Sequence, residues 1–130
     1  MTSSRHNNRL LSSQQFRKVY SQGRKFDTPY FSAFFLKNET GDQRLGITVT
    51  RKLGSAVIRN RCKRRLREVF RLRDQAILAD IGYDLVLNAK TELIRASFNQ
   101  INEAFSQTVK RYQEHLSRVA THNQRELMTR

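Results

Sequence analysis

The chain has 130 residues, about the length of one average domain, and a single core of that size can be stable without disulfides or metal ions. It carries 25 Lys and Arg against 11 Asp and Glu, which gives a net charge of +14 and a pI of about 11.1. This charge far exceeds what solubility requires, so it predicts a polyanionic partner. The alternative is a solvated cationic surface without a partner.

Cysteine usage and hydropathy indicate a cytoplasmic protein. The single cysteine, Cys62, excludes an intramolecular disulfide and suits a reducing compartment. Residues 1–8 are polar and lack the apolar core of a signal peptide, and the longest apolar run, near residues 30–36, is too short to span a bilayer. We expect one domain over residues 1–130, with an ordered core at about 9–115 and flexible ends at 1–8 and 117–130.

A short helix is predicted first. Ser12 and Gln15 form a capping box, and Gly23 is expected to end the helix. One face of this helix is apolar or aromatic, formed by Phe16, Val19 and Tyr20.

Two extended segments follow. Residues 30–36 are rich in aromatic side chains, and residues 44–50 alternate apolar with polar or small side chains. Residues 38–43 between them have the composition of a turn, so we predict an antiparallel hairpin. Whether residues 23–28 add another short strand is left open by the sequence.

A second helix is predicted from Ala56 to Arg71. Its expected buried stripe has helical spacing, with Phe70 beside it: Ile58, Cys62, Leu66 and Val69. Residues 74–81 read either as a helical tail or as a loop, and residues 83–88 as a strand.

The last predicted helix begins at a second capping box, Ser97 with Gln100. Its apolar positions are Phe98, Ile101, Phe105, Val109 and Tyr112. Beyond Leu116 this periodicity is lost, and we expect the helix to fray there. The order of elements predicts an α+β fold, in which three helices pack as a two-layer sandwich on a mostly antiparallel sheet of about four strands.

The second helix concentrates the positive charge. Residues 51–73 contain ten Lys or Arg and one acid, Glu68, a net charge of +9. Arg59, Lys63 and Arg67 follow one another at four-residue steps, where like charges repel, so a helix selected for stability alone would contain more acids. Arg61, Arg64 and Arg65 complete the predicted exposed arc. Arginine outnumbers lysine here, which suits bidentate phosphate contacts and stacking on bases.

Aromatic residues gather in the N-terminal half. Strand alternation places Phe31 and Phe35 on one face, and Tyr30 and Phe34 on the other. One set is expected in the core. The other, together with the rings of the first helix, is a candidate platform for stacking single-stranded nucleotides, whereas core packing is the alternative for each ring taken alone.

A conventional active site is not predicted. The three histidines are far apart in sequence, the acids are scattered, and Gly54 stands alone where a phosphate loop needs several glycines. Cys62 falls in the apolar stripe and is better explained as a core residue than as a nucleophile. We therefore expect no catalytic residue, no protein metal site and no small-molecule substrate.

Residues 54–68, GSAVIRNRCKRRLRE, closely resemble the signature of the protein subunit of bacterial ribonuclease P, whose hallmark is the triplet Arg59-Asn60-Arg61. The resemblance extends in order from about Arg9 to Tyr112. Departures are mild, since Tyr20 stands where Phe is frequent and Cys62 where an aliphatic residue is usual. The tail beyond Leu116 has no clear match.

The resemblance implies an α/β sandwich with a left-handed βαβ crossover, contrary to the usual right-handed rule. It also implies partnership with a large catalytic RNA that removes the 5′ leader of precursor tRNA. Magnesium would be held mainly by that RNA, and the protein would bind the leader in a central cleft and raise the affinity for metal and substrate.

Site residues are implied by matching positions. The residues implied to bind the RNA subunit are Arg59, Asn60, Arg61, Lys63, Arg64, Arg65 and Arg67. Those implied to line the leader cleft are Phe16, Tyr20, Phe34 and Lys52, and Asn60, Arg64 and Arg67 are also polar candidates near it.

Three other interpretations fit parts of the sequence. A ribosomal-type RNA-binding protein would have the same composition and a similar basic helix. A DNA-binding helix is disfavoured because no helix-turn-helix pair precedes the basic helix. Binding of that helix to an anionic membrane is disfavoured because its apolar residues are needed for the core.

Overall fold

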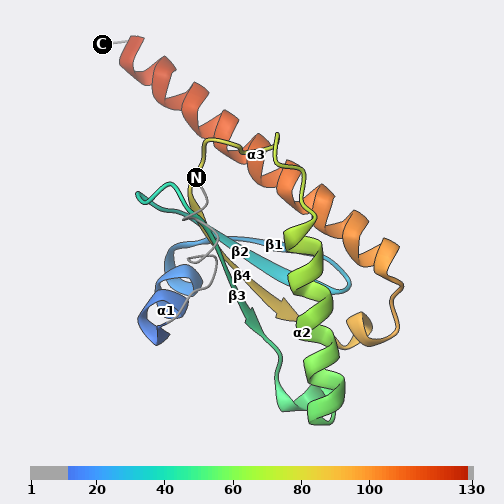
Figure 1. Cartoon of the computed structure of the whole chain (residues 1–130). Coiled ribbons are helices and arrows are strands. Elements are labelled where there is room, and N and C mark those ends of the chain that lie inside the picture. The colour runs from blue at the N-terminus through green and yellow to red at the C-terminus, as the bar shows by residue number, and fades with distance from the viewer. Residues whose placement is uncertain (1–11, 129–130) are drawn as a thin grey trace.

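The computed structural model describes residues 12–128, and side chains as far as Arg125. Three α-helices, four strands and two short 3-10 helices alternate along the described chain (Figure 1). In chain order they are α1 (Ser13–Gln22), β1 (Arg24–Asp27), β2 (Phe31–Lys37), β3 (Gln43–Thr48), η2 (Arg51–Leu53), α2 (Ala56–Arg71), β4 (Tyr83–Ala89), η3 (Thr91–Ile94) and α3 (Phe98–Met128). The predicted α+β class and the predicted bounds of α2 are confirmed.

The strands form one mixed sheet in the order β1-β2-β4-β3. β2 is antiparallel to both β1 and β4, whereas β3 is parallel to β4. The predicted hairpin between residues 30–36 and 44–50 is therefore wrong, because β4 lies between these strands. The hairpin that does form joins β1 to β2, which settles the open question of a strand near residues 23–28.

Burial explains why β4 takes a central position. Its first five residues, 83–87, are all buried, so both of its faces need cover. β1 is short, and only Phe26 in it is buried, which suits an edge strand. The composition of the turn at residues 38–43 contains no information on which distant strand pairs with β2.

The main core lies between one face of the sheet and the helices α2 and α3. Phe31 and Phe35 from β2 and Leu85 and Leu87 from β4 point into it, and all four are at most 1% exposed. From α3 the core receives the predicted stripe, of which Ile101, Phe105, Val109 and Tyr112 are buried. With α2 and α3 the sheet forms the predicted sandwich. The third helix, α1, packs instead on the opposite face of the sheet through β2 and β4, so the three helices do not share one layer.

The helix starts confirm the predicted capping. The Ser12 hydroxyl accepts from the Gln15 amide at 3.1 Å, and the Ser97 hydroxyl accepts from the Gln100 amide at 3.1 Å. Each glutamine side chain in turn accepts from the backbone amide of its serine, as a capping box requires. Gly23 ends α1 in an extended conformation, and a Cβ there would lie 2.4 Å from the Val19 carbonyl oxygen. Close approach rather than a left-handed backbone therefore requires this glycine.

The last helix is longer than the sequence suggested. We expected fraying beyond Leu116, but α3 continues to Met128 and extends past the rest of the fold at its C-terminal end (Figure 1). Loss of apolar periodicity marks where a helix leaves the core, which is a different point from where its backbone hydrogen bonds end.

The connection from β3 through α2 to β4 is the expected βαβ crossover, because the two strands are parallel neighbours. Its left-handedness stays a prediction. The crossover places the basic helix on the core face beside β3, at the edge of the sheet opposite β1.

Candidate nucleic-acid interface

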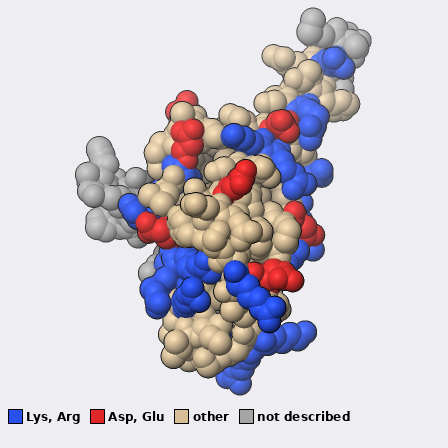
Figure 2. Space-filling model, turned by 90° about the vertical axis from the view of Figure 1, so that its right-hand side faces the viewer, with Lys and Arg blue, Asp and Glu red and all other residues tan. Residues whose placement is uncertain are grey.

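α2 presents a cationic arc on the side away from the core. Ser55 caps the helix by accepting from the Ile58 amide, and the core side buries Cys62, Leu66, Val69 and Phe70. The remaining predicted site residues of this helix point outward. Asn60, Arg61, Arg64 and Arg67 are exposed, and Arg59 and Lys63 are half-buried. We call these six residues the α2 arc, and cationic side chains are prominent on this side of the molecule (Figure 2).

The one acid of the helix does not neutralise the α2 arc. Glu68 is paired with Arg71, whose guanidinium donates to both carboxylate oxygens at 3.0 and 2.6 Å. This hydrogen bond lowers the pKa of Glu68 and raises the pKa of Arg71. The α2 arc is therefore left without an acidic partner from its own helix.

Arg65 differs from the other arginines. Its guanidinium is half-buried and donates to the backbone carbonyls of Leu93, at 3.1 Å, and of Ala96. Burial, and then the charge of Arg61, lower the pKa of Arg65. The prediction that Arg65 lies on the exposed arc is wrong, because its neighbours Cys62 and Leu66 turn that edge of the helix toward the η3 segment.

The buried stripe of α2 begins later along the helix than predicted. Ile58 was predicted as its first member, but it is 36% exposed, and its neighbour Val57 is 77% exposed. The first turn of α2 extends beyond the area that the sheet and α3 cover. Cys62 is buried as predicted, and burial raises the pKa of its thiol against the charges of Arg65 and Arg61, so the unreactive thiol is favoured.

A second candidate surface lies across the sheet. Phe16 and Tyr20 project from α1 and Phe34 from β2, over a small cluster formed by Val19 and Val86. The Tyr20 ring is 6.5 Å from Phe16 and 5.0 Å, edge to face, from Phe34, measured between ring centroids. Tyr20 is 37% exposed and the two phenylalanines are half-buried. The three predicted cleft aromatics are thus brought together, and we call them the aromatic face.

Polar side chains that sequence reasoning missed border the aromatic face. The Tyr20 hydroxyl donates to Asn88 Oδ1 at 2.6 Å and lies 2.9 Å from the Thr48 hydroxyl. Lys25 lies 5.7 Å from the Phe34 ring centroid, within cation–π distance. Strand alternation puts Thr48 and Asn88 on this face, but only the pairing of β3 with β4 makes them direct neighbours. The hairpin predicted from the sequence would have paired β3 with β2 instead.

Lys52 connects the two surfaces along the chain. It is exposed in η2, between the end of β3, which supplies Thr48, and the start of α2. Gly54 closes this turn at φ +138°, a conformation that a residue with a side chain rarely adopts. The turn leads the chain directly from the aromatic face to the cationic helix.

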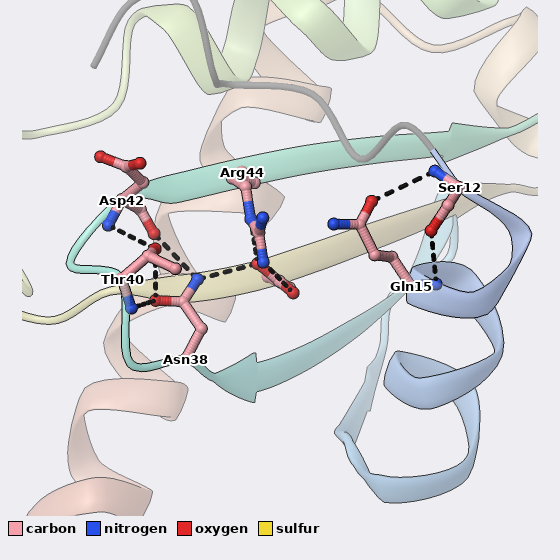
Figure 3. A network of polar contacts seen from close by, with 7 residues as sticks. Ser12, Gln15, Asn38, Thr40, Asp42 and Arg44 are labelled. Carbon is pink, nitrogen blue, oxygen red and sulfur yellow. Dashed lines mark hydrogen bonds and ion pairs between the residues drawn. The ribbon is translucent and has the colours of Figure 1, made fainter. Parts of the chain in front are cut away.

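At the other end of the same sheet face, paired polar side chains replace the aromatic rings. Arg44 donates to both oxygens of Asp84 at 2.8 and 2.9 Å, and Asn38 donates to Asp84 at 2.8 Å. Asn38 also donates to the Asp42 carbonyl, so the loop between β2 and β3 is tied to β4 (Figure 3). Arg44 is therefore neutralised within the fold and is a weak candidate for contact with a polyanion.

Neither metal nor membrane chemistry is evident in the described structure. Residues 12–128 contain no group of three or more His, Cys, Asp or Glu side chains arranged to hold a metal ion. None of the described helices combines the length and the apolar character needed to cross a bilayer. The features that stand out are therefore the cationic helix and the aromatic face.

Comparison with known proteins places this geometry in a family. The profile of the family described as Ribonuclease P matches residues 5–113. The chain belongs to the ribonuclease P protein family. Membership confirms the class indicated by the Arg59-Asn60-Arg61 triplet, the protein component of a ribonucleoprotein nuclease of tRNA processing.

Relatives and solved structures agree with this assignment. The chain is 38% identical to the ribonuclease P protein component of Clostridioides difficile (strain 630) over 103 residues, which are 78% of this chain and 89% of the relative. It is similar to the RNase P protein of Thermotoga maritima, with a TM-score of 0.70 and 34% identity over 79% of this chain and 96% of that one. The Staphylococcus aureus RNase P protein gives a TM-score of 0.70 at 29% identity, covering 79% and 93% of the two chains.

Proposed function

We propose that the chain binds the catalytic RNA of ribonuclease P through the α2 arc and the 5′ leader of precursor tRNA on the aromatic face. The observation that carries the first half is the set of outward cationic side chains on α2, which lack acidic partners on their helix. A large RNA supplies the missing counter-charge, and arginine provides bidentate contacts to its phosphates.

The second half rests on the exposed rings. Stacking requires a ring that is held in place and still accessible, and Tyr20 combines hydrogen bonds to β3 and β4 with a 37% exposed side chain. Stacking is tolerant of sequence because every base has a π face, so this surface suits leaders of different sequences.

The cleavage itself is assigned to the RNA partner. We propose that the RNA partner would hold most of the magnesium needed for phosphodiester hydrolysis, and that the protein raises the affinity for metal and substrate by binding the leader. The described side chains support this division, because their acids are dispersed or engaged with arginine and lysine. A cytoplasmic location, where precursor tRNA is made in bacteria, is part of the proposal.

Reconstitution tests the proposal directly. The full chain is mixed with a bacterial ribonuclease P RNA at low magnesium, and the removal of the 5′ leader from precursor tRNA is followed. We expect cleavage to be stimulated strongly at low magnesium and weakly at high magnesium, where the RNA alone suffices. Absence of stimulation, together with tight association with ribosomes, would favour a ribosomal-type protein and overturn the proposal.

A further inference from the structure

The C-terminal part of α3 carries a second, separate line of basic side chains. Arg111, His115, Arg118, His122 and Arg125 follow one another at alternating steps of four and three residues. At 100° per residue these positions fall within an arc of about 80° on one side of the helix. We call this set the α3 stripe. Its three arginines and His122 are exposed, and Figure 2 shows cationic atoms on the projecting end of the helix.

The first residues of the α3 stripe lie beside the β1 edge of the sheet. The Arg111 guanidinium lies 5.1 Å from the centroid of the Phe26 ring, which belongs to β1. The pKa of His115 is lowered, first by burial and then by the positive charges of Arg24 and Arg118. Arg24, at the start of β1, therefore adds to the same positive surface. β1 and β3 are opposite edges of the sheet, so this surface is separate from the α2 arc.

The three arginines of the α3 stripe are not paired with an acid among the described side chains. Arg44 and Arg71 are each paired with a carboxylate, whereas none of the ion pairs among the described side chains involves an arginine of the stripe. Glu114 is exposed and borders the stripe at about 60° from its centre by helical geometry. By the same geometry the sequence places Glu126 at about 60° on the other side, so two acids border three arginines and the balance stays positive.

The length of the stripe selects the kind of partner. A rise of 1.5 Å per residue separates Arg111 from Arg125 by about 21 Å. A small anion can contact one of these side chains at a time, whereas a nucleic-acid backbone offers phosphates along the whole length. We propose that the α3 stripe is a further RNA-binding surface, which contacts the phosphate backbone of an RNA strand outside the α2 arc and the aromatic face.

The stripe extends beyond the part of the chain shared with the family. The family match ends at residue 113, so Arg118, His122 and Arg125 lie outside it. The proposal therefore goes beyond the function proposed for the α2 arc and the aromatic face.

Salt dependence of binding tests the stripe. The variant Arg118→Gln/Arg125→Gln removes two charges and leaves Arg111, which packs on Phe26, in place. Lys37→Gln/Lys110→Gln is the matched control, because both lysines are exposed, lie off the stripe and reduce the net charge equally. Affinity for the catalytic RNA, and of the assembled holoenzyme for precursor tRNA, is measured over a range of salt concentrations.

We expect the stripe variant to bind either the catalytic RNA or precursor tRNA about 3- to 10-fold more weakly. The slope of log affinity against log salt concentration should be shallower by about 1.5 to 2 units. The control should change little. Loss with the catalytic RNA identifies that RNA as the partner, whereas loss only with precursor tRNA identifies the substrate. The variant Arg118→Lys/Arg125→Lys, which keeps the charge, should restore most of the slope.

Several outcomes would overturn the proposal. They are an unchanged slope in both arms, an equal loss in the control, or the absence of RNA binding by the unmodified chain. Vesicles that contain anionic lipid form a third arm, and a loss confined to them would assign the stripe to a membrane surface instead. Circular dichroism of each variant checks that α3 remains helical.

Discussion

The α2 arc and the aromatic face offer two different kinds of contact to a nucleic acid. Apart from Asn60, the α2 arc consists of long, separate, charged side chains without acidic partners on their helix. The aromatic face consists of rings that pack on one another, and hydrogen bonds hold the Tyr20 ring in place. Charge acts over a distance and is screened by salt, but stacking acts only on contact and is far less sensitive to salt. The two surfaces should therefore respond differently to salt and to the presence of a leader.

The largest expected effect follows from charge reversal on the α2 arc. In Arg61→Glu/Arg64→Glu two exposed phosphate contacts become repulsive, so affinity for the catalytic RNA should fall roughly 100-fold at moderate salt, and the salt slope by about two units. Binding titrations at several salt concentrations measure both. Lys37→Glu/Lys110→Glu is the control, and an equal loss there would mean that net charge rather than the α2 arc determines binding.

Removing a ring from the aromatic face should affect only substrates that have a leader. In Phe34→Ala we expect a loss of about 1–3 kcal/mol in holoenzyme affinity for precursor tRNA, and no loss for tRNA without a leader, because the lost contact is base stacking. Phe31→Ala, on the core face of the same strand, should instead lower the free energy of unfolding by about 3–5 kcal/mol. If Phe34→Ala only destabilised the fold, its ring would belong to the core.

Arg65 and Arg64 are adjacent in sequence but should behave differently. Arg65→Ala leaves the carbonyls of Leu93 and Ala96 without their guanidinium donor, so the free energy of unfolding should fall by about 1–2 kcal/mol. Arg64→Ala should stay within about 0.5 kcal/mol of the unmodified chain and reduce the salt slope by roughly one unit. Urea unfolding measures the free energy of unfolding of both variants, and RNA titration measures their salt slopes. Equal reductions of the salt slope would show that Arg65 contacts RNA as Arg64 does.

The smallest expected effect concerns the Tyr20 hydroxyl. Tyr20→Phe keeps the ring but removes the hydrogen bonds to Asn88 and Thr48, so the free energy of unfolding should fall by about 0.5–1.5 kcal/mol. Leader affinity should be retained, because the ring performs the stacking. A loss of leader affinity as large as that of Phe34→Ala would show instead that the hydroxyl contacts RNA.

Local sequence patterns predicted the starts of the helices, their caps and the faces of the strands. Ser12 with Gln15 and Ser97 with Gln100 are local signals, and so is the spacing of Cys62, Leu66 and Val69. Each pattern arises from residues within a turn or two of one another, so it can be recognised without knowing the fold. The Arg59-Asn60-Arg61 triplet indicated the family for the same reason, because it is contiguous.

Tertiary structure alone decided which distant segments meet. β4 separates β2 from β3 because it is the strand buried on both faces, and this pairing brings Asn88 and Thr48 to Tyr20. Arg65 donates to the carbonyls of Leu93 and Ala96, which are 28 and 31 residues away in sequence. These outcomes depend on which distant elements bury the most apolar surface in the same core. A local pattern of side chains contains no information on that balance.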